Sequence, residues 1–138
     1  MAYFKDAQEV YDTIGKLFAE LAEDEELAPK FRKANTIVQY DYREPDSKIT
    51  VRLKEDEPGD VDFGETEMEP EVTMRMKADT AHRFWLGEVN VTMAIARGEI
   101  KPEGPVAKIL KLVPLTKPVF PRYKAMLEAD GRKELLDI

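Results

Sequence analysis

Residues 82–112 of the chain are HRFWLGEVNVTMAIARGEIKPEGPVAKILKL, and this stretch decides the expected fold. It holds three short apolar segments, separated by Gly87, Gly98 and Gly104. A helix that ends at a glycine can change direction there, so these segments are not expected to form one long core helix. Protein interiors are close-packed, and a space between elements requires a stiff support that holds them apart. The pattern therefore favours short elements arranged around a cavity for an apolar ligand.

The same stretch predicts two short helices, a strand and a further helix. Asp79 is the expected N-cap of the first helix and Asn90 that of the second, and each helix ends at the glycine that follows it. Residues 99–103, EIKPE, are typical of a short strand, and the proline in it lacks an N–H, which predicts a sheet edge. Pro105 is expected at the first position of the next helix.

Helical spacing also dominates the N-terminal part of the chain. Apolar side chains recur at steps of three and four over residues 3–21, which predicts an amphipathic helix. Asp6 and Glu9 stand where a variant of the capping box would lie. A second short helix is expected within residues 23–35.

The period changes to two after residue 35, which is typical of strands. Residues 37–43 and 48–54 alternate apolar and polar side chains on either side of the turn EPDS, and they predict an antiparallel hairpin with one wet face. Residues 61–66 are a weaker strand, interrupted by a glycine, and residues 71–77 are a clearer one.

The last helix is expected to start at Thr116 and to end before Gly131. Runs of strands separated from runs of helices indicate an α+β protein. We expect a five-stranded, mainly antiparallel sheet with helices packed on one face. A length of 138 residues fits a single domain, residues 1–138.

Composition argues against most enzyme classes. The chain has no cysteine, one histidine (His82) and one serine (Ser47), which occur in unrelated contexts. Disulfides, thiol chemistry and a thiolate metal site are thereby excluded, and a Ser/His triad or a zinc site finds no support. We expect no enzyme, no metal and no cofactor. His82 is expected to be exposed or structural, and Asp79 to be a cap.

Charge and hydropathy exclude further classes. The net charge of −7 argues against nucleic-acid binding. The N-terminus does not have the pattern of a signal peptide, and no window has the length of a membrane span. A soluble, cytoplasmic protein is expected. Residues 55–71 are acidic without calcium-loop spacing, whereas residues 97–124 are basic and predict either a solvated face or weak contact with an anionic membrane.

Two stretches resemble the sterol carrier protein-2 family of lipid-binding domains. EPEVTMRMKADTAHRFWLGEVN, residues 69–90, is similar to that family's strand and Asp-led helix, followed by Gly and Asn. AIARGEIKPEGPVAKILKL, residues 94–112, resembles its strand between two glycines and the amphipathic helix after it. The likeness is strongest over residues 71–115, and the N-terminal helix and hairpin agree in order.

The resemblance implies a five-stranded sheet covered by helices, with an apolar tunnel between the layers. It also implies non-catalytic binding or transfer of a lipid, such as a fatty acid, an acyl-CoA, a sterol or an isoprenoid. Two features depart from the family. The chain ends Leu-Leu-Asp-Ile where peroxisomal members carry a Ser-Lys-Leu type signal, which argues against peroxisomes. Pro105 stands where members tend to carry a polar residue.

Twelve apolar side chains are the candidate ligand contacts, since methionines and large side chains suit a promiscuous apolar site. They are Met74, Met76, Phe84, Trp85, Met93, Ile95, Ile109, Leu112, Leu115, Val119, Phe120 and Met126. Ordinary core packing is the alternative for each of them. Three prolines keep residues 113–121 from forming one helix, and this segment is either a mobile lid or a plain connection.

Three functions compete at this stage. The first is lipid binding or transfer. The second is an accessory subunit for an enzyme of lipid or quinone metabolism, which uses the apolar helices to bind a protein partner. The third, a small enzyme that relies on carboxylates, is the weakest. Oligomeric state is left open, with a homodimer among the alternatives.

Overall fold

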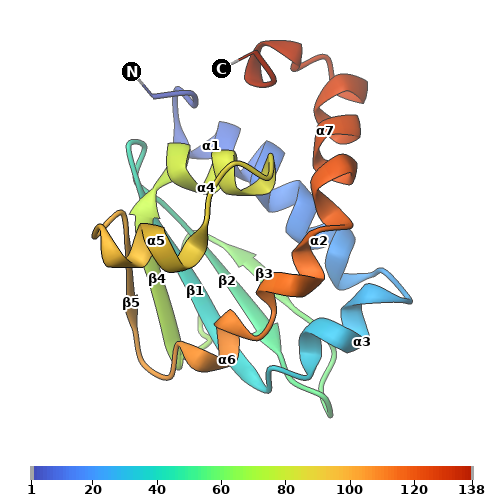
Figure 1. Cartoon of the computed structure of the whole chain (residues 1–138). Coiled ribbons are helices and arrows are strands. Elements are labelled where there is room, and N and C mark those ends of the chain that lie inside the picture. Colours follow the sequence, from blue (N-terminus) through green and yellow to red (C-terminus); the bar gives the residue numbers. More distant parts are fainter. Residues whose placement is uncertain (1, 138) are drawn as a thin grey trace.

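The computed structural model describes residues 2–137, in which helices cover one face of a five-stranded sheet (Figure 1). The strands are β1 (Thr36–Arg43), β2 (Ser47–Leu53), β3 (Val61–Phe63), β4 (Val72–Lys77) and β5 (Ile100–Glu103). The α-helices are α1 (Ala7–Val10), α2 (Lys16–Ala22), α3 (Leu27–Arg32), α4 (Ala78–Trp85), α5 (Val91–Ala96), α6 (Ala107–Leu110) and α7 (Val119–Ala129). Three further turns are η1 (Tyr11–Gly15), η2 (Val113–Thr116) and η3 (Lys133–Leu135). The predicted order of elements is confirmed.

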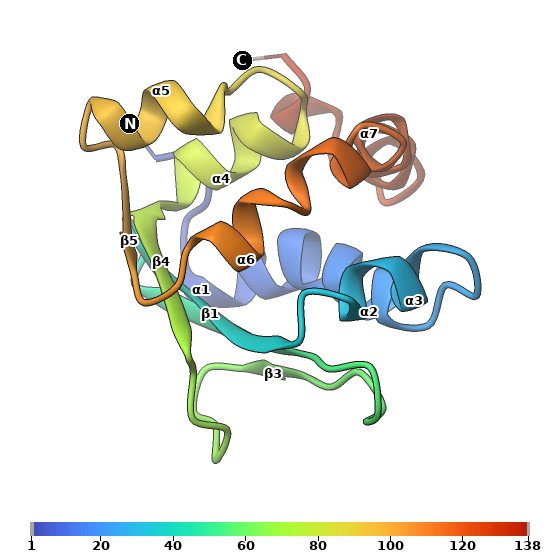
Figure 2. The ribbon, with the colours of Figure 1, turned by 60° about the horizontal axis from the view of Figure 1, so that its bottom comes forward.

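The sheet has the strand order β3-β2-β1-β4-β5. Three of its pairings are antiparallel and one, between β1 and β4, is parallel. The predicted α+β class and mainly antiparallel sheet are confirmed. The strand EIKPE lies at the edge, as its proline predicts, with Pro102 opposite Met74. Figure 2 shows the helices gathered above the sheet on one side.

The covered face of the sheet is apolar because alternate strand residues point to the same side. Val38 of β1 lies between Val51 of β2 and Val72 of β4, and all three are buried. Tyr40 and Tyr42 continue this face toward the end of β1. It forms a stiff, apolar floor under the helices.

The N-terminal helical segment runs through α1, η1 and α2, as the apolar periodicity predicts. Asp6 caps it by accepting a hydrogen bond from the backbone N–H of Glu9 at 2.9 Å. The turn η1 has π-helical geometry, and Gly15 at its end faces the ring of Phe63. A methyl group at position 15 would stand 2.9 Å from that ring, so a side chain there would require the exposed Phe63 ring to shift.

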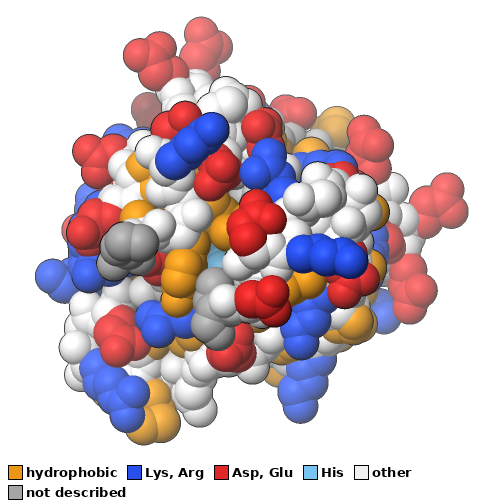
Figure 3. All heavy atoms as spheres, turned by 90° about the horizontal axis from the view of Figure 1, so that it is seen from above, with side chains coloured by type: hydrophobic (Ala, Val, Ile, Leu, Met, Phe, Trp, Pro, Cys, Tyr) orange, Lys and Arg blue, Asp and Glu red, His pale blue; other side chains and the backbone are white. Residues whose placement is uncertain are grey.

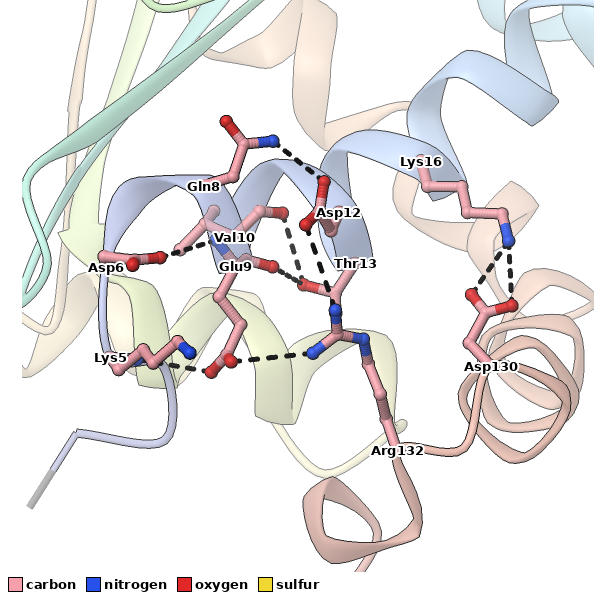
Figure 4. Close-up of polar contacts among 10 residues, drawn as sticks. All are labelled: Lys5, Asp6, Gln8, Glu9, Val10, Asp12, Thr13, Lys16, Asp130 and Arg132. Carbon is pink, nitrogen blue, oxygen red and sulfur yellow. Dashed lines mark hydrogen bonds and ion pairs between the residues drawn. The ribbon is translucent and has the colours of Figure 1, made fainter.

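The two ends of the chain pack together through ion pairs (Figure 4). Lys16 lies 2.8 Å from Asp130, and Arg132 lies 3.5 Å from Glu9 and 3.9 Å from Asp12. These contacts attach the C-terminal residues to the first helices. Because most of these groups are partly exposed, we expect each pair to contribute less than about 1 kcal/mol.

Three predicted helix boundaries are wrong. Asp79 does not cap α4, because β4 runs directly into the helix and Lys77 occupies the N-cap position. The Asp79 carboxylate instead accepts a hydrogen bond from the backbone N–H of Tyr3 at 2.9 Å. Pro105 precedes α6 by two residues, and Thr116 ends η2 rather than starting α7.

His82 is a structural residue of α4, fully buried where this helix meets α7 and the C-terminal turn η3. Its Nε2 lies 2.7 Å from the carbonyl oxygen of Leu135, which can only accept, so Nε2 carries the proton. Nδ1 then accepts a hydrogen bond from the Tyr123 hydroxyl at 2.8 Å. The imidazole therefore fits this site in its neutral form.

Acidification is expected to destabilise the protein below about pH 6.5 through His82. Burial lowers the pKa of His82 from 6.5, so the unfolded chain binds a proton that the folded protein resists. The free energy of unfolding should fall by up to about 1.4 kcal/mol per pH unit as pH decreases. Chemical denaturation at pH 7, 6 and 5 measures this slope.

The matched variant for this experiment is His82→Gln, which has no titrating group at the position. It should lose the slope between pH 6.5 and pH 5. Asp24 and Glu71 do not interfere, because contacts lower their carboxyl pKa values from 3.8 and 4.5, and they titrate in more acidic solution. An equal slope in the wild type and the variant would contradict the assignment.

Candidate functional site

An apolar hollow of about 120 Å³ lies between the sheet and the helices that cover it. Its floor is formed by the middle strands, through Val38, Tyr40, Tyr42, Met74 and Met76. The surrounding walls come from α2, α3, α4, α6 and η2, and include Phe18, Leu21, Phe31, Ala81, Phe84, Trp85, Ile109, Leu110, Leu112 and Val113. The sheet thus provides the stiff support that the segmented sequence led us to expect.

Aromatic rings form much of one wall. Phe18 of α2 packs with its ring centroid 5.2 Å from Tyr40 and 5.5 Å from Trp85. Phe84 packs edge-on against Trp85 at 4.9 Å and against Phe120 at 5.7 Å. Edge-to-face packing of this kind fixes ring positions and adds to the free energy of burial.

The few polar groups that line the hollow differ in how they are satisfied. The guanidinium of Arg52 pairs with Asp60 at 2.8 Å and with Glu57 at 3.2 Å. The hydroxyl of Thr116 donates to the carbonyl of Val113 at 2.6 Å. Arg32 differs, since its buried Nε has no hydrogen-bond partner among residues 2–137.

Two tyrosines add hydroxyl groups to the floor. Burial raises the pKa of Tyr40 to about 12, and burial raises the pKa of Tyr42 as well, so both stay protonated near neutral pH. The lining thus holds no nucleophile or general base that is ionised by its surroundings. The arrangement suits binding of an apolar molecule.

Six of the twelve predicted ligand contacts line the hollow, and they come from β4, α4 and the α6 region. They are Met74, Met76, Phe84, Trp85, Ile109 and Leu112. The other six do not line it. They are Met93, Ile95, Leu115, Val119, Phe120 and Met126. Met93 is 48 % exposed on α5, whereas Val119 is fully buried in the core.

The N-terminal half of the chain also contributes to the hollow, although its residues were not predicted as ligand contacts. Phe18 and Leu21 reach the hollow from α2, and Val38, Tyr40 and Tyr42 reach it from β1. Alternation along β1 was the available signal, since it groups these three strand residues on one face. Arg32 was also missed, because a sequence does not show that a charged side chain will lack a partner.

The size of the hollow limits what enters it in this conformation. An apolar cavity of about 150 Å³ is enough for a molecule such as benzene. Sites for larger ligands usually measure about 300–1,000 Å³. A long-chain ligand therefore requires the helical wall to move outward.

The surface outside the hollow is mostly charged. Figure 3 shows acidic and basic side chains intermixed on the face seen from above, with small apolar areas between them. Phe63 and Met93 are the large hydrophobic side chains exposed among the described residues. No helix within residues 2–137 has the length and hydropathy needed to cross a bilayer.

Comparison with known families and structures gives a consistent result. A family model described as the SCP-2 sterol transfer family matches residues 14–117. The sterol carrier protein 2 domain of Helicoverpa armigera is 19 % identical, with a TM-score of 0.65, and the match covers 87 % of this chain and 94 % of that one. Sterol carrier protein 2 of Yarrowia lipolytica is 19 % identical, with a TM-score of 0.59 and coverage of 70 % and 88 %.

A third structure is that of a palmitated sterol carrier protein 2 like 2 from Aedes aegypti. It is 22 % identical, with a TM-score of 0.55, and the match covers 78 % of this chain and 94 % of that one. At these identities the likenesses show the fold. A comparison with curated protein sequences finds no match.

Proposed function

Because the chain belongs to the SCP-2 sterol transfer family, we propose that it binds an apolar lipid in the hollow between its sheet and its helices and releases it without chemical change. The observation that carries the proposal is the hollow itself, whose lining is apolar apart from a few polar groups. Family and fold support lipid binding in general. A fatty acid, an acyl-CoA, a sterol and an isoprenoid are the candidate ligands.

Burial of hydrocarbon alone accounts for useful affinity. Each methylene group removed from water contributes about 0.8 kcal/mol, so ten of them contribute about 8 kcal/mol before ordering costs. A micromolar complex requires a net value of about this size. No catalytic group is needed, which agrees with a non-enzymatic carrier.

The wall that moves is proposed to be residues 113–121, which include η2 and the start of α7. Pro114 lies in the first turn of η2, Pro118 is the N-cap of α7 and Pro121 lies in its first turn, so the prolines divide this segment into short helical pieces. Leu115, Val119 and Phe120 belong to it, so they would meet a ligand only after it moves. Met93, Ile95 and Met126 lie elsewhere, and their contact with a ligand remains a prediction.

An organic extract of freshly purified protein tests the proposal. We expect mass spectrometry of the extract to show a bound lipid in amounts comparable to the protein. Lipids added to stripped protein should displace the neutral fluorescent probe N-phenyl-1-naphthylamine. Hydrogen exchange at residues 113–121 should slow when the lipid binds. Empty protein, together with no displacement by any of the four lipid classes, would contradict lipid binding.

Contact with an anionic membrane is a further part of the proposal. Within the basic stretch 97–124, Lys108 pairs with Glu71 and Arg122 with Asp24, which leaves Lys111 and Lys117 as exposed cations close to η2. Attraction of this kind is weak and sensitive to salt. Sedimentation with phosphatidylserine vesicles, but not with phosphatidylcholine vesicles, and its loss at high salt, would support it.

The structure does not favour the alternative of an accessory subunit. That function requires a contiguous exposed apolar patch. The two large exposed hydrophobic side chains of the described residues, Phe63 and Met93, lie on separate elements, β3 and α5. We therefore do not propose the accessory-subunit function.

A further inference from the structure

Arg32 is the last residue of α3 and lines the hollow. Its Nε–H group is buried and donates no hydrogen bond to any group within residues 2–137. Within residues 2–137, every other half-buried arginine pairs with at least one carboxylate. These are Arg52, Arg75, Arg122 and Arg132. Arg32 is therefore the one half-buried arginine within residues 2–137 that has no carboxylate partner, and it lines the apolar hollow.

A buried donor without a partner destabilises the folded protein, so buried polar groups are almost always hydrogen-bonded. An arginine presents its N–H groups in a planar fork that matches the two oxygens of a carboxylate. We infer that Arg32 binds the anionic head group of an amphiphile whose hydrocarbon chain occupies the hollow. This inference rests on the proposed lipid-binding function and adds the chemical class of the ligand.

The position of Arg32 also gives the ligand a direction. α3 packs against η2 and β2, and β1 begins four residues after Arg32, so the head group lies at the end of the sheet where β1 starts. The floor then extends along β1 from Val38 to Tyr42, about 13 Å at the usual rise per strand residue. The hydrocarbon chain would run along this floor toward Trp85.

Charge near Arg32 favours an anion. Lys30 and Lys33 flank it in the sequence, so residues 30–33 carry three positive charges on a chain whose net charge is −7, and of these Lys30 also pairs with Glu26 at 3.9 Å. Cations at the C-terminal end of a helix are also favoured by the helix dipole, which is a purely structural reason for an arginine here. A test must separate these two roles.

Competition between two ligands of equal length separates them. Decanoate and decan-1-ol share a ten-carbon chain and differ in charge, and both are titrated against protein loaded with N-phenyl-1-naphthylamine. We expect Arg32→Gln to lower the decanoate-to-decanol affinity ratio by about tenfold, because a hydrogen-bonded charge is lost. Arg32→Lys, which keeps the charge and loses the fork, should lower the ratio less. Arg97→Gln, at an exposed position, should leave it unchanged.

Each other outcome is decisive. If the wild type binds neither ligand, the proposed function fails and the inference fails with it. If it binds both, and Arg32→Gln leaves the ratio unchanged, lipid binding stands and the head-group assignment is overturned. The assignment would also be overturned if Arg32→Gln weakened the affinities for decanoate and decan-1-ol equally, because Arg32 would then have only a structural role. Binding of decan-1-ol serves as the measure that the variant is folded.

Discussion

Val38→Phe is expected to weaken lipid binding about 30-fold. Val38 is fully buried in the floor, at the centre of the sheet, and its side chain borders the hollow. A phenyl ring there occupies space that two or three methylene groups of the ligand would otherwise fill. Each methylene contributes about 0.8 kcal/mol, and about 1.4 kcal/mol corresponds to a tenfold change in affinity. Displacement of N-phenyl-1-naphthylamine by a fatty acid measures the effect.

Ile37→Phe is the matched control for this variant. Ile37 precedes Val38 on β1 and points to the opposite face of the sheet, away from the hollow. The substitution Ile37→Phe introduces the same ring into the same strand but on the face away from the hollow. We therefore expect the lipid affinity to stay within about twofold of the wild type. Thermal unfolding of both variants checks that they remain folded. Unchanged binding by a folded Val38→Phe would place the ligand elsewhere.

Gly104→Ala is expected to lower the free energy of unfolding by about 4 kcal/mol. Gly104 follows β5 with a φ of +87°, in a region that side chains disfavour. A methyl group there would also collide with the backbone carbonyl oxygen of Glu71, the residue before β4. Backbone strain and overpacking cost about 1–3 kcal/mol each. Urea denaturation measures the loss, which should appear as a lower midpoint with an unchanged slope.

Gly98→Ala separates strain from collision. Gly98 has a similar φ of +77°, but no atom lies within 4 Å of the position that its methyl group would take. It should cost only about 1–2 kcal/mol. Similar losses in the two variants would show that the contact with Glu71 relaxes freely, contrary to the expectation for a backbone atom.

The sheet was predictable because one of its faces is apolar. Alternation along residues 37–43, 48–54 and 71–77 marks strands whatever their partners are. It does not distinguish parallel from antiparallel neighbours, so the parallel pairing of β1 with β4 could not be predicted from the residues. Asp79 was misassigned for a related reason. An acidic residue suits both the N-cap and the first turn, and only the direct passage from β4 into α4 decides between them.

The candidate site was predictable to a smaller extent. Methionines and aromatic residues after position 70 stood out because they recur in short segments, and half of those named do line the hollow. Residues such as Phe18 and Tyr40 reach it from helices and strands that also build the core. Their sequence pattern is the same in either role, because exposure to a cavity is decided by how the layers meet.

The pairing of β1 with β4 has a consequence for synthesis of the protein. These neighbours in the middle of the sheet are separated along the chain by β2, β3 and the acidic loop before β4. A nascent chain therefore lacks half of its floor until residue 77 has left the ribosome, and contacts between distant strands form slowly. The apolar residues of the incomplete sheet stay exposed to solvent during that interval, which makes the early intermediate prone to aggregation.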